Sequence, residues 1–128
     1  MTIECSWADE ALRRIDCIIT GAFSWDEFFA HLAELQTMLC GIDHDVYIIV
    51  RIQSERFPTG NPLPRLHSLV DCLPPQVTAL IFFSERPLIC APLYGFLERY
   101  HRLGGKRLHL VRYEQDLTHL LRRLAVVA

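Results

Sequence analysis

The tripeptide Ser-Glu-Arg occurs twice, at residues 54–56 and 84–86, and both copies stand where a binding site can form. Each follows a run of apolar residues typical of a strand that is buried on both faces. If the two strands are parallel neighbours, both triplets lie at the same edge of the sheet, where ligands of such sheets bind. Arg56 and Arg86 would then lie near helix N-termini and hold an anion or an acidic partner. The alternative is that each Glu-Arg pair is a solvated loop charge.

Aromatic side chains at predicted loop and surface positions indicate a second kind of site. Phe57 stands in the polar loop 53–60, and no periodic pattern places it inward. Trp7 and Tyr94 are further candidates for side chains that point partly outward. An exposed apolar patch of this kind would mark an interface with a protein partner or with a second copy of the chain. The alternative is that Phe57 folds over its own core.

Residues that could carry out catalysis or hold a metal ion follow no recognisable spacing. The six His are scattered, and the five Cys include no Cys-x-x-Cys pair. Glycine-rich phosphate loops and the Gly-x-Ser-x-Gly turn are absent. Cys90 lies four residues from Arg86 near a predicted helix start, a setting that can lower the pKa of a thiol. A buried apolar role is the simpler account for Cys90, as for most of the cysteines. We therefore expect no enzyme activity, no cofactor and no metal site.

Composition indicates a single cytoplasmic domain that spans residues 1–128. A chain of 128 residues fits one domain, and its net charge of −2 does not favour nucleic acid as a partner. No apolar run approaches the roughly 20 residues that a membrane span requires. Residues 1–4 lack the basic and apolar segments that begin a signal peptide.

The elements that position the candidate residues begin with an antiparallel hairpin. Alternating apolar residues predict one strand near residues 3–7 and a second near residues 12–20, joined by a short turn. A helix over about residues 25–40 follows, because Ser24 and Glu27 match a capping box. The aromatic residues on either side of this box match a hydrophobic staple.

The rest of the chain alternates strands and helices. Strands are expected at residues 46–52, 77–83 and 108–111, and helices at about residues 61–73, 87–102 and 113–125. Asn61 is a good N-cap and Pro62 a good first helical residue. Pro92 lies in the first turn of its helix, if that helix starts near Ala91, or else it kinks the helix. We predict an α/β fold with an N-terminal β-hairpin followed by βα units. Its sheet is mixed and mainly parallel, with about five strands and about four helices.

This order of elements resembles the STAS family of sulfate transporter and anti-sigma factor antagonist domains. The closer resemblance is to small stand-alone bacterial relatives whose first helix opens with an aromatic-Ser/Thr-Trp-Asp-Glu-Phe phrase, as residues 23–28 do here. The resemblance implies a switch, in which a partner kinase phosphorylates a Ser or Thr at the helix start after the central strand. That position falls here on Gly60 or Asn61, which have no hydroxyl group, and Thr59 is one residue away. The standard phosphoacceptor is therefore missing, and Asn61 has a sufficient role as an N-cap.

The residues and the resemblance together predict a non-enzymatic STAS-like regulatory or protein-interaction domain. Its partner would be another protein or a second copy of the chain, with no nucleic acid and no membrane span. The alternative is a module that binds a small molecule, an anion or a lipid in a pocket near residues 53–60 and 84–90. The residues that we expect to take part in binding or regulation are Arg56, Phe57, Thr59, Asn61 and Arg86.

Overall fold

A computed structural model describes residues 2–127, with side chains described from Ile3 to Leu124. Its strands are β1 (Thr2–Trp7), β2 (Arg14–Thr20), β3 (Val46–Ile52), β4 (Val77–Phe83) and β5 (Leu108–Val111). Its helices are α1 (Trp25–Met38), α2 (Leu63–Cys72), α3 (Pro87–Arg102) and α4 (Glu114–Val127). The predicted α/β fold, with a hairpin followed by βα units, is confirmed.

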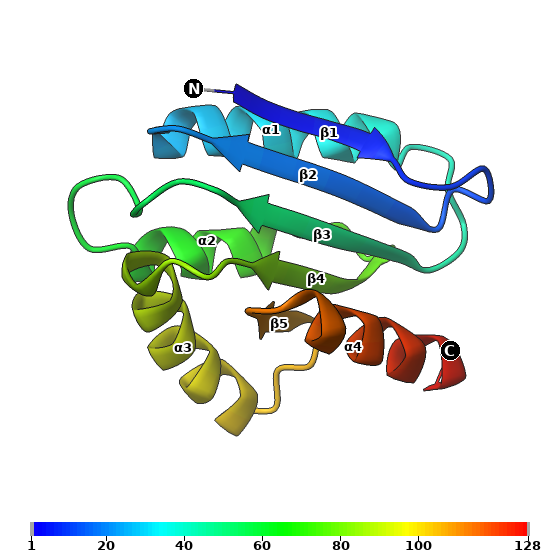
Figure 1. The fold of residues 1–128 in the computed structure, drawn as a ribbon. Helices are drawn as coiled ribbons and strands as arrows, with labels where there is room; N and C mark the ends of the chain where they lie inside the picture. The colour runs from blue at the N-terminus through cyan, green and yellow to red at the C-terminus, as the bar shows by residue number, and fades with distance from the viewer. Residues whose placement is uncertain (1, 128) are drawn as a thin grey trace.

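The five strands lie in one sheet in the order of the sequence, β1-β2-β3-β4-β5. β1 and β2 pair antiparallel, and every later pair is parallel. Each βα connection moves one strand along the sheet in the same direction, so right-handed crossovers place α1, α2 and α3 on one face. α4 follows the last strand and lies on the other face (Figure 1).

Two apolar clusters join the helices to the sheet. The larger cluster lies between the sheet and α1, α2 and α3. The smaller lies between the sheet and α4, and its buried members are Ile49, Ala79, Ile81, Val111, Leu117 and Leu120. Alternate residues of a strand point to opposite faces, so helices on both faces require β3 and β4 to be apolar at nearly every position.

Ser24 begins α1 as predicted. Its Oγ accepts a hydrogen bond from the Glu27 amide at 3.1 Å and donates one to the Glu27 carboxylate, also at 3.1 Å. Phe23 packs against Phe28 with ring centroids 6.4 Å apart, which completes the hydrophobic staple. α1 ends at Met38, slightly before the predicted end.

The starts of α2 and α3 depend on proline and its neighbours. Pro62 is the N-cap of α2, and Oδ1 of Asn61 accepts a hydrogen bond from the Leu63 amide at 3.1 Å. The prediction that Asn61 is the N-cap and Pro62 the first helical residue is therefore wrong by one position, although Asn61 still bonds the first helical amide. α3 begins at Pro87 and continues through Pro92, so a start near residue 91 is wrong. Inside α3, Pro92 leaves one backbone hydrogen bond unmade, because proline has no N–H.

Candidate functional site

The carboxyl edge of the sheet brings the two Ser-Glu-Arg triplets together, because β3 and β4 are parallel neighbours. Nη1 of Arg86 lies 3.2 Å from Oε1 of Glu55. Both serines are buried: Ser54 donates a hydrogen bond to the Gly21 carbonyl, and Oγ of Ser84 accepts one from the Arg86 amide at 3.1 Å. The carboxylate of one triplet thus offsets the guanidinium of the other, which leaves Arg86 less available to an external anion.

The other predicted site residues have different surroundings at this edge. Phe57 is 9% exposed and stacks on Trp25 with ring centroids 5.4 Å apart. The interpretation of Phe57 as an exposed contact is therefore wrong, and the alternative, a ring folded over its own core, is confirmed. Thr59 and Arg56 are exposed, and Arg56 has no ion pair within residues 2–127. Asn61 is exposed and caps α2.

A second ion pair lies at the same edge, on the side of α4. Arg51 bonds the carboxylate of Glu114, and its guanidinium lies 4.8 Å from the centre of the Phe83 ring. The depression beside these residues has a volume of about 760 Å³, and both of its lining arginines, Arg51 and Arg86, are paired with carboxylates. In a doubly wound sheet, a crevice opens at the carboxyl edge where the strand order reverses. The described sheet has no reversal, so the depressions at this edge, of about 760 and 650 Å³, are not a crevice of that kind.

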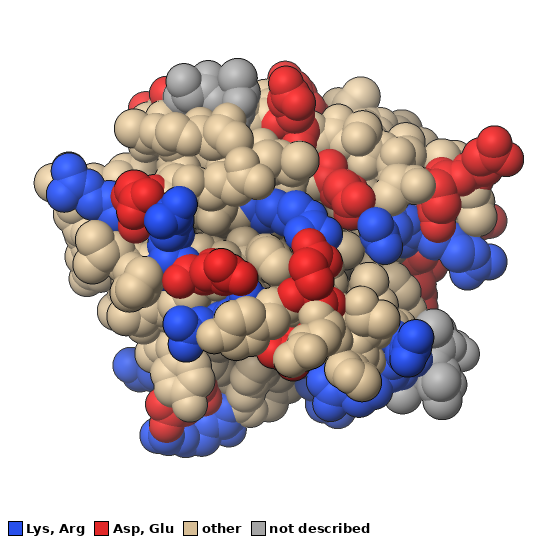
Figure 2. All heavy atoms as spheres, viewed as in Figure 1, with Lys and Arg blue, Asp and Glu red and all other residues tan. Residues whose placement is uncertain are grey.

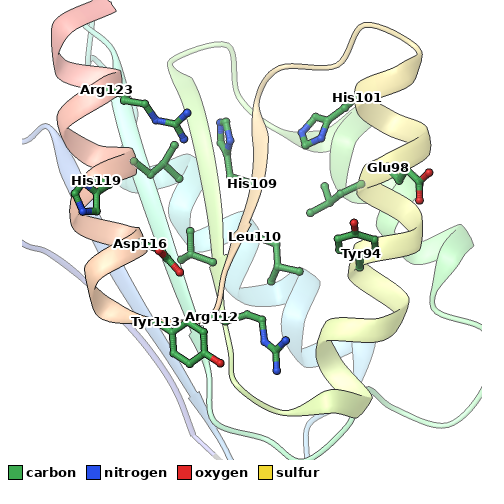
Figure 3. Close-up of a pocket in the computed structure, with 13 residues that line it drawn as sticks. Tyr94, Glu98, His101, His109, Leu110, Arg112, Tyr113, Asp116, His119 and Arg123 are labelled. Atoms are coloured by element: carbon green, nitrogen blue, oxygen red, sulfur yellow. The ribbon is translucent and has the colours of Figure 1, made fainter.

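The helices change from one face of the sheet to the other at β5. Here a groove of about 790 Å³ lies between α3 and α4, beside the edge strand (Figure 3). Tyr94 and His101 line this β5 groove from α3, and His119 and Arg123 line it from α4. His109 lies on the strand between them (Figure 3). Tyr94 is 68% exposed, as predicted for an outward aromatic residue.

The outer edge of β5 carries backbone groups that no other described strand pairs. Amides of β4 and of the residue after it bond the carbonyls of Arg107 and Val111, so the odd-numbered residues face β4. Successive residues of a strand direct their backbone groups to opposite sides, and Leu108 and Leu110 therefore face outward. The Leu108 carbonyl lies 2.8 Å from Nε2 of His101. The amide and carbonyl of Leu110 remain at the open edge.

Positive charge gathers inside the β5 groove. Burial lowers the pKa of His109, and the nearby His101 and Arg123 lower it further, against the effect of a hydrogen bond at the Lys106 backbone. Nε2 of His109 is buried and finds no hydrogen-bond partner in the described part of the chain. Figure 3 shows Arg123, His109 and His101 along one end of the groove. The imidazole is therefore held neutral in cationic surroundings.

The arginines of the groove are not matched by carboxylates. Glu98 lines the groove, but it pairs with Arg102 at 2.9 Å on its own helix. Within the described residues, neither Arg112 nor Arg123 forms an ion pair, and Asp116 is the one lining carboxylate without a pair. An acidic ligand would therefore find two guanidinium groups without a described carboxylate partner, one of them 5.9 Å from the centre of the Tyr113 ring.

Cys90 is not an activated thiol. Burial raises its pKa, and its Sγ donates a hydrogen bond to the Ser84 carbonyl at 3.1 Å. The buried interpretation is confirmed for Cys90 and Cys17. Cys5 is half-buried and Cys40 and Cys72 are exposed, so the prediction that most of the cysteines are buried is wrong.

Sequence reasoning missed the β5 groove because its residues share no motif. His101, His109 and His119 come from three elements, and only the strand order brings those elements together. One signal was present: β5 has 4 residues and is the shortest described strand, and very short strands are typical of sheet edges.

Further observations bear on the class of function. No group of three or more His, Cys, Asp or Glu among the described side chains could hold a metal ion. Between residues 2 and 127, no helix has the length and the apolar character that crossing a bilayer requires. Lys and Arg are interspersed with Asp and Glu over the face that Figure 2 shows.

No family model matches the chain, and no curated protein or solved structure matches it.

Proposed function

We propose that this chain is a non-enzymatic protein-interaction domain, which binds an extended acidic segment of a partner protein in the β5 groove. The observation that carries the proposal is the open edge of β5 between two helices. A peptide strand added there would bond the outward amide and carbonyl of Leu110. Strand addition of this kind takes affinity from backbone hydrogen bonds and specificity from the side chains of the groove.

The shape of the groove favours a single strand over a second copy of the sheet. Paired strands lie about 4.8 Å apart, whereas a helix with its side chains is about 10 Å wide. α3 and α4 stand on the two faces of the sheet beside β5, and both line the groove (Figure 3). Two copies meeting at this edge would bring helix against helix before their strands could pair. A lone extended segment avoids that collision.

The side chains of the groove favour an acidic segment with apolar contacts. No described carboxylate pairs with Arg112 or Arg123, and both guanidinium groups line the groove. Tyr94 and Tyr113 are 68% and 49% exposed at the rim. Tyrosine and arginine are enriched among residues that dominate binding energy at protein interfaces.

Fluorescence anisotropy with a short labelled peptide of alternating Glu and Val residues tests this proposal. The matched probe carries Lys in place of every Glu. We expect the acidic peptide to bind at least about tenfold more tightly at low salt, because complementary charge steers association. The Arg112→Glu, Arg123→Glu double variant should reverse the preference. The Arg56→Ala, Arg86→Ala double variant at the carboxyl edge should leave it unchanged.

A second variant tests whether the peptide bonds the backbone of β5. Leu110→Pro removes the outward amide together with a side chain that packs partly against the larger cluster, and proline is tolerated where an edge strand has no ladder bond to lose. Circular dichroism should show an unchanged fold, while the acidic peptide loses most of its affinity. The proposal is overturned if both peptides bind equally, if neither binds at about 1 mM, or if sedimentation shows a dimer that Leu110→Pro dissociates.

The regulatory part of the proposal draws on the resemblance to STAS domains. It is supported by the order of elements and by the loop after β3, in which the Ser54 hydroxyl is buried and the Thr59 side chain is exposed. Thr59 is therefore the hydroxyl that a kinase could reach. Mass spectrometry of the protein from its own cells tests this part. Complete absence of phosphate on Thr59 in every growth phase would contradict the proposed phosphorylation.

The anion-binding alternative concerns Arg56, which forms no ion pair with any described residue. Titration with inorganic phosphate, followed by heteronuclear NMR, would support it if the largest shifts centre on residues 54–60. Shifts centred on the β5 groove would instead favour the proposed site.

A further inference from the structure

Cys5 and Cys17 lie directly opposite each other in the antiparallel pair of β1 and β2. The amide of Ala8 bonds the carbonyl of Arg14 at 2.8 Å, which makes that pair a hydrogen-bonded one. Hydrogen-bonded and non-hydrogen-bonded pairs alternate along an antiparallel ladder. Cys5 and Cys17 lie three pairs along the ladder from Ala8 and Arg14. They therefore form a non-hydrogen-bonded pair.

The pairing of β2 with its parallel neighbour β3 also indicates that Cys5 and Cys17 form a non-hydrogen-bonded pair. The amide of Tyr47 bonds the Arg13 carbonyl, and the amide of Gln53 bonds the Ile19 carbonyl. Odd-numbered residues of β2, Cys17 included, thus direct their backbone groups toward β3. In a non-hydrogen-bonded pair the Cα atoms lie about 4.5 Å apart. This distance falls within the range of about 4.4 to 6.8 Å that disulfides span.

The two side chains interact across the register. Their interaction lowers the pKa of Cys5 and raises that of Cys17. Burial and the charge of Glu34 partly oppose the lowering at Cys5. Cys5 is half-buried, whereas Cys17 is buried. Cys5 is therefore the more accessible and the more nucleophilic of the two.

A small cavity lies beside both sulfurs. It has a volume of about 30 Å³ and is lined by Cys5, Cys17 and His31 together with apolar side chains of α1 and the sheet. This volume admits one molecule of about the size of water. Hydrogen peroxide is only slightly larger, whereas a bulky disulfide reagent would not enter.

We propose that Cys5 and Cys17 form an intramolecular cross-strand disulfide when the protein meets a peroxide. The Cys5 thiolate attacks one peroxide oxygen, so that an S–O bond forms, the O–O bond breaks, and the leaving hydroxide takes a proton to become water. The Cys17 thiol then attacks the Cys5 sulfur. The S–S bond forms, the S–O bond breaks, and the hydroxyl leaves as water with the Cys17 proton. The two sulfurs lose two electrons in total, and the peroxide gains them.

The bond would fasten β1, the outer strand of the hairpin, to the rest of the sheet. Closing the loop between residues 5 and 17 restricts the unfolded chain. It also prevents β1 from separating and exposing the edge of β2, which would be open to pairing with other chains. Oxidation therefore makes this half of the sheet more resistant to unfolding.

Peptide mapping of the full chain tests the proposal, because Arg13 and Arg14 lie between the two cysteines. Trypsin separates residues 1–13, which contain Cys5, from residues 15–51, which contain Cys17 and Cys40. The Cys40→Ser variant removes the ambiguity in the second fragment. After hydrogen peroxide treatment and blocking of free thiols, we expect a linked pair of fragments, lighter by two hydrogen atoms than their sum. The Cys5→Ser, Cys40→Ser variant should yield no linked pair.

Urea denaturation supplies a second readout. The midpoint should rise on oxidation in Cys40→Ser and stay unchanged in Cys5→Ser, Cys40→Ser, while Cys72→Ser should behave as the parent chain. The proposal is overturned if Cys5 is recovered as a blocked thiol or a sulfinic acid, or if it is linked to another molecule. An unchanged or lower midpoint in the linked protein would contradict a bond that fits the native register.

Discussion

Replacing Phe57 with Ala should destabilise the protein by about 3 kcal/mol, because its ring belongs to the core. Phe57 is 9% exposed and stacks on Trp25 at an interplanar angle of 14°. It also meets Phe23 edge to face, with ring centroids 6.3 Å apart. Truncating a buried Phe to Ala costs about 3–5 kcal/mol. The lower end applies here because Phe57 lies in a loop, whose backbone can relax into part of the space.

Urea denaturation followed by far-ultraviolet circular dichroism measures this loss without relying on the fluorescence of Trp25. With a slope of about 2 kcal/mol per molar urea, the midpoint of Phe57→Ala should fall by about 1.5 M. Phe57→Leu keeps most of the apolar volume and should cost about 1 kcal/mol. The exposed neighbour supplies the control, since Arg56→Ala should stay within about 0.5 kcal/mol. A loss below about 1 kcal/mol in Phe57→Ala would refute the assignment of this ring to the core.

Three further changes test other parts of the structure. Ser24→Ala removes the acceptor for the Glu27 amide and should cost about 1 kcal/mol in urea denaturation; a neutral result would contradict the capping box. Arg107→Met breaks charged hydrogen bonds to backbone carbonyls, including one to Val77 at 2.8 Å, and should lower stability by about 2 kcal/mol. Burial, followed by neighbouring positive charge, lowers the pKa of His109 below its value in the unfolded chain, so the unfolded chain takes up the proton first. Stability should therefore fall as the pH drops below about 6.5, and His109→Gln should reduce that fall; identical pH profiles for the two proteins would contradict the shift.

The elements of the fold could be predicted because each depends on a short stretch of sequence. The capping box at Ser24 is a local signal for the start of a helix, and nearly continuous apolar runs such as Val46–Ile52 indicate buried strands. The start of α3 was harder to predict, because burial of Ile89 and Leu93 outweighs the bond that Pro92 cannot make. Such tertiary contacts also decide which loop side chains are buried. Nothing near Phe57 in the sequence shows that the helix after the hairpin will supply its stacking partner.

The position of the candidate site could not be predicted in the same way, because it depends on the order of the strands. Alternating strands and helices fit a sheet whose order reverses, and they fit equally a sheet that follows the sequence. The first opens a crevice at the carboxyl edge, where Arg56 and Arg86 were expected to bind a ligand. In the observed order all three crossover helices lie on one face, and α4 covers the other. The helix before β5 and the helix after it therefore lie on opposite faces of the sheet, so the open backbone of Leu110 lies between two helices. Residues without any shared motif thereby become neighbours, which is why the β5 groove follows from topology and not from spacing in the sequence.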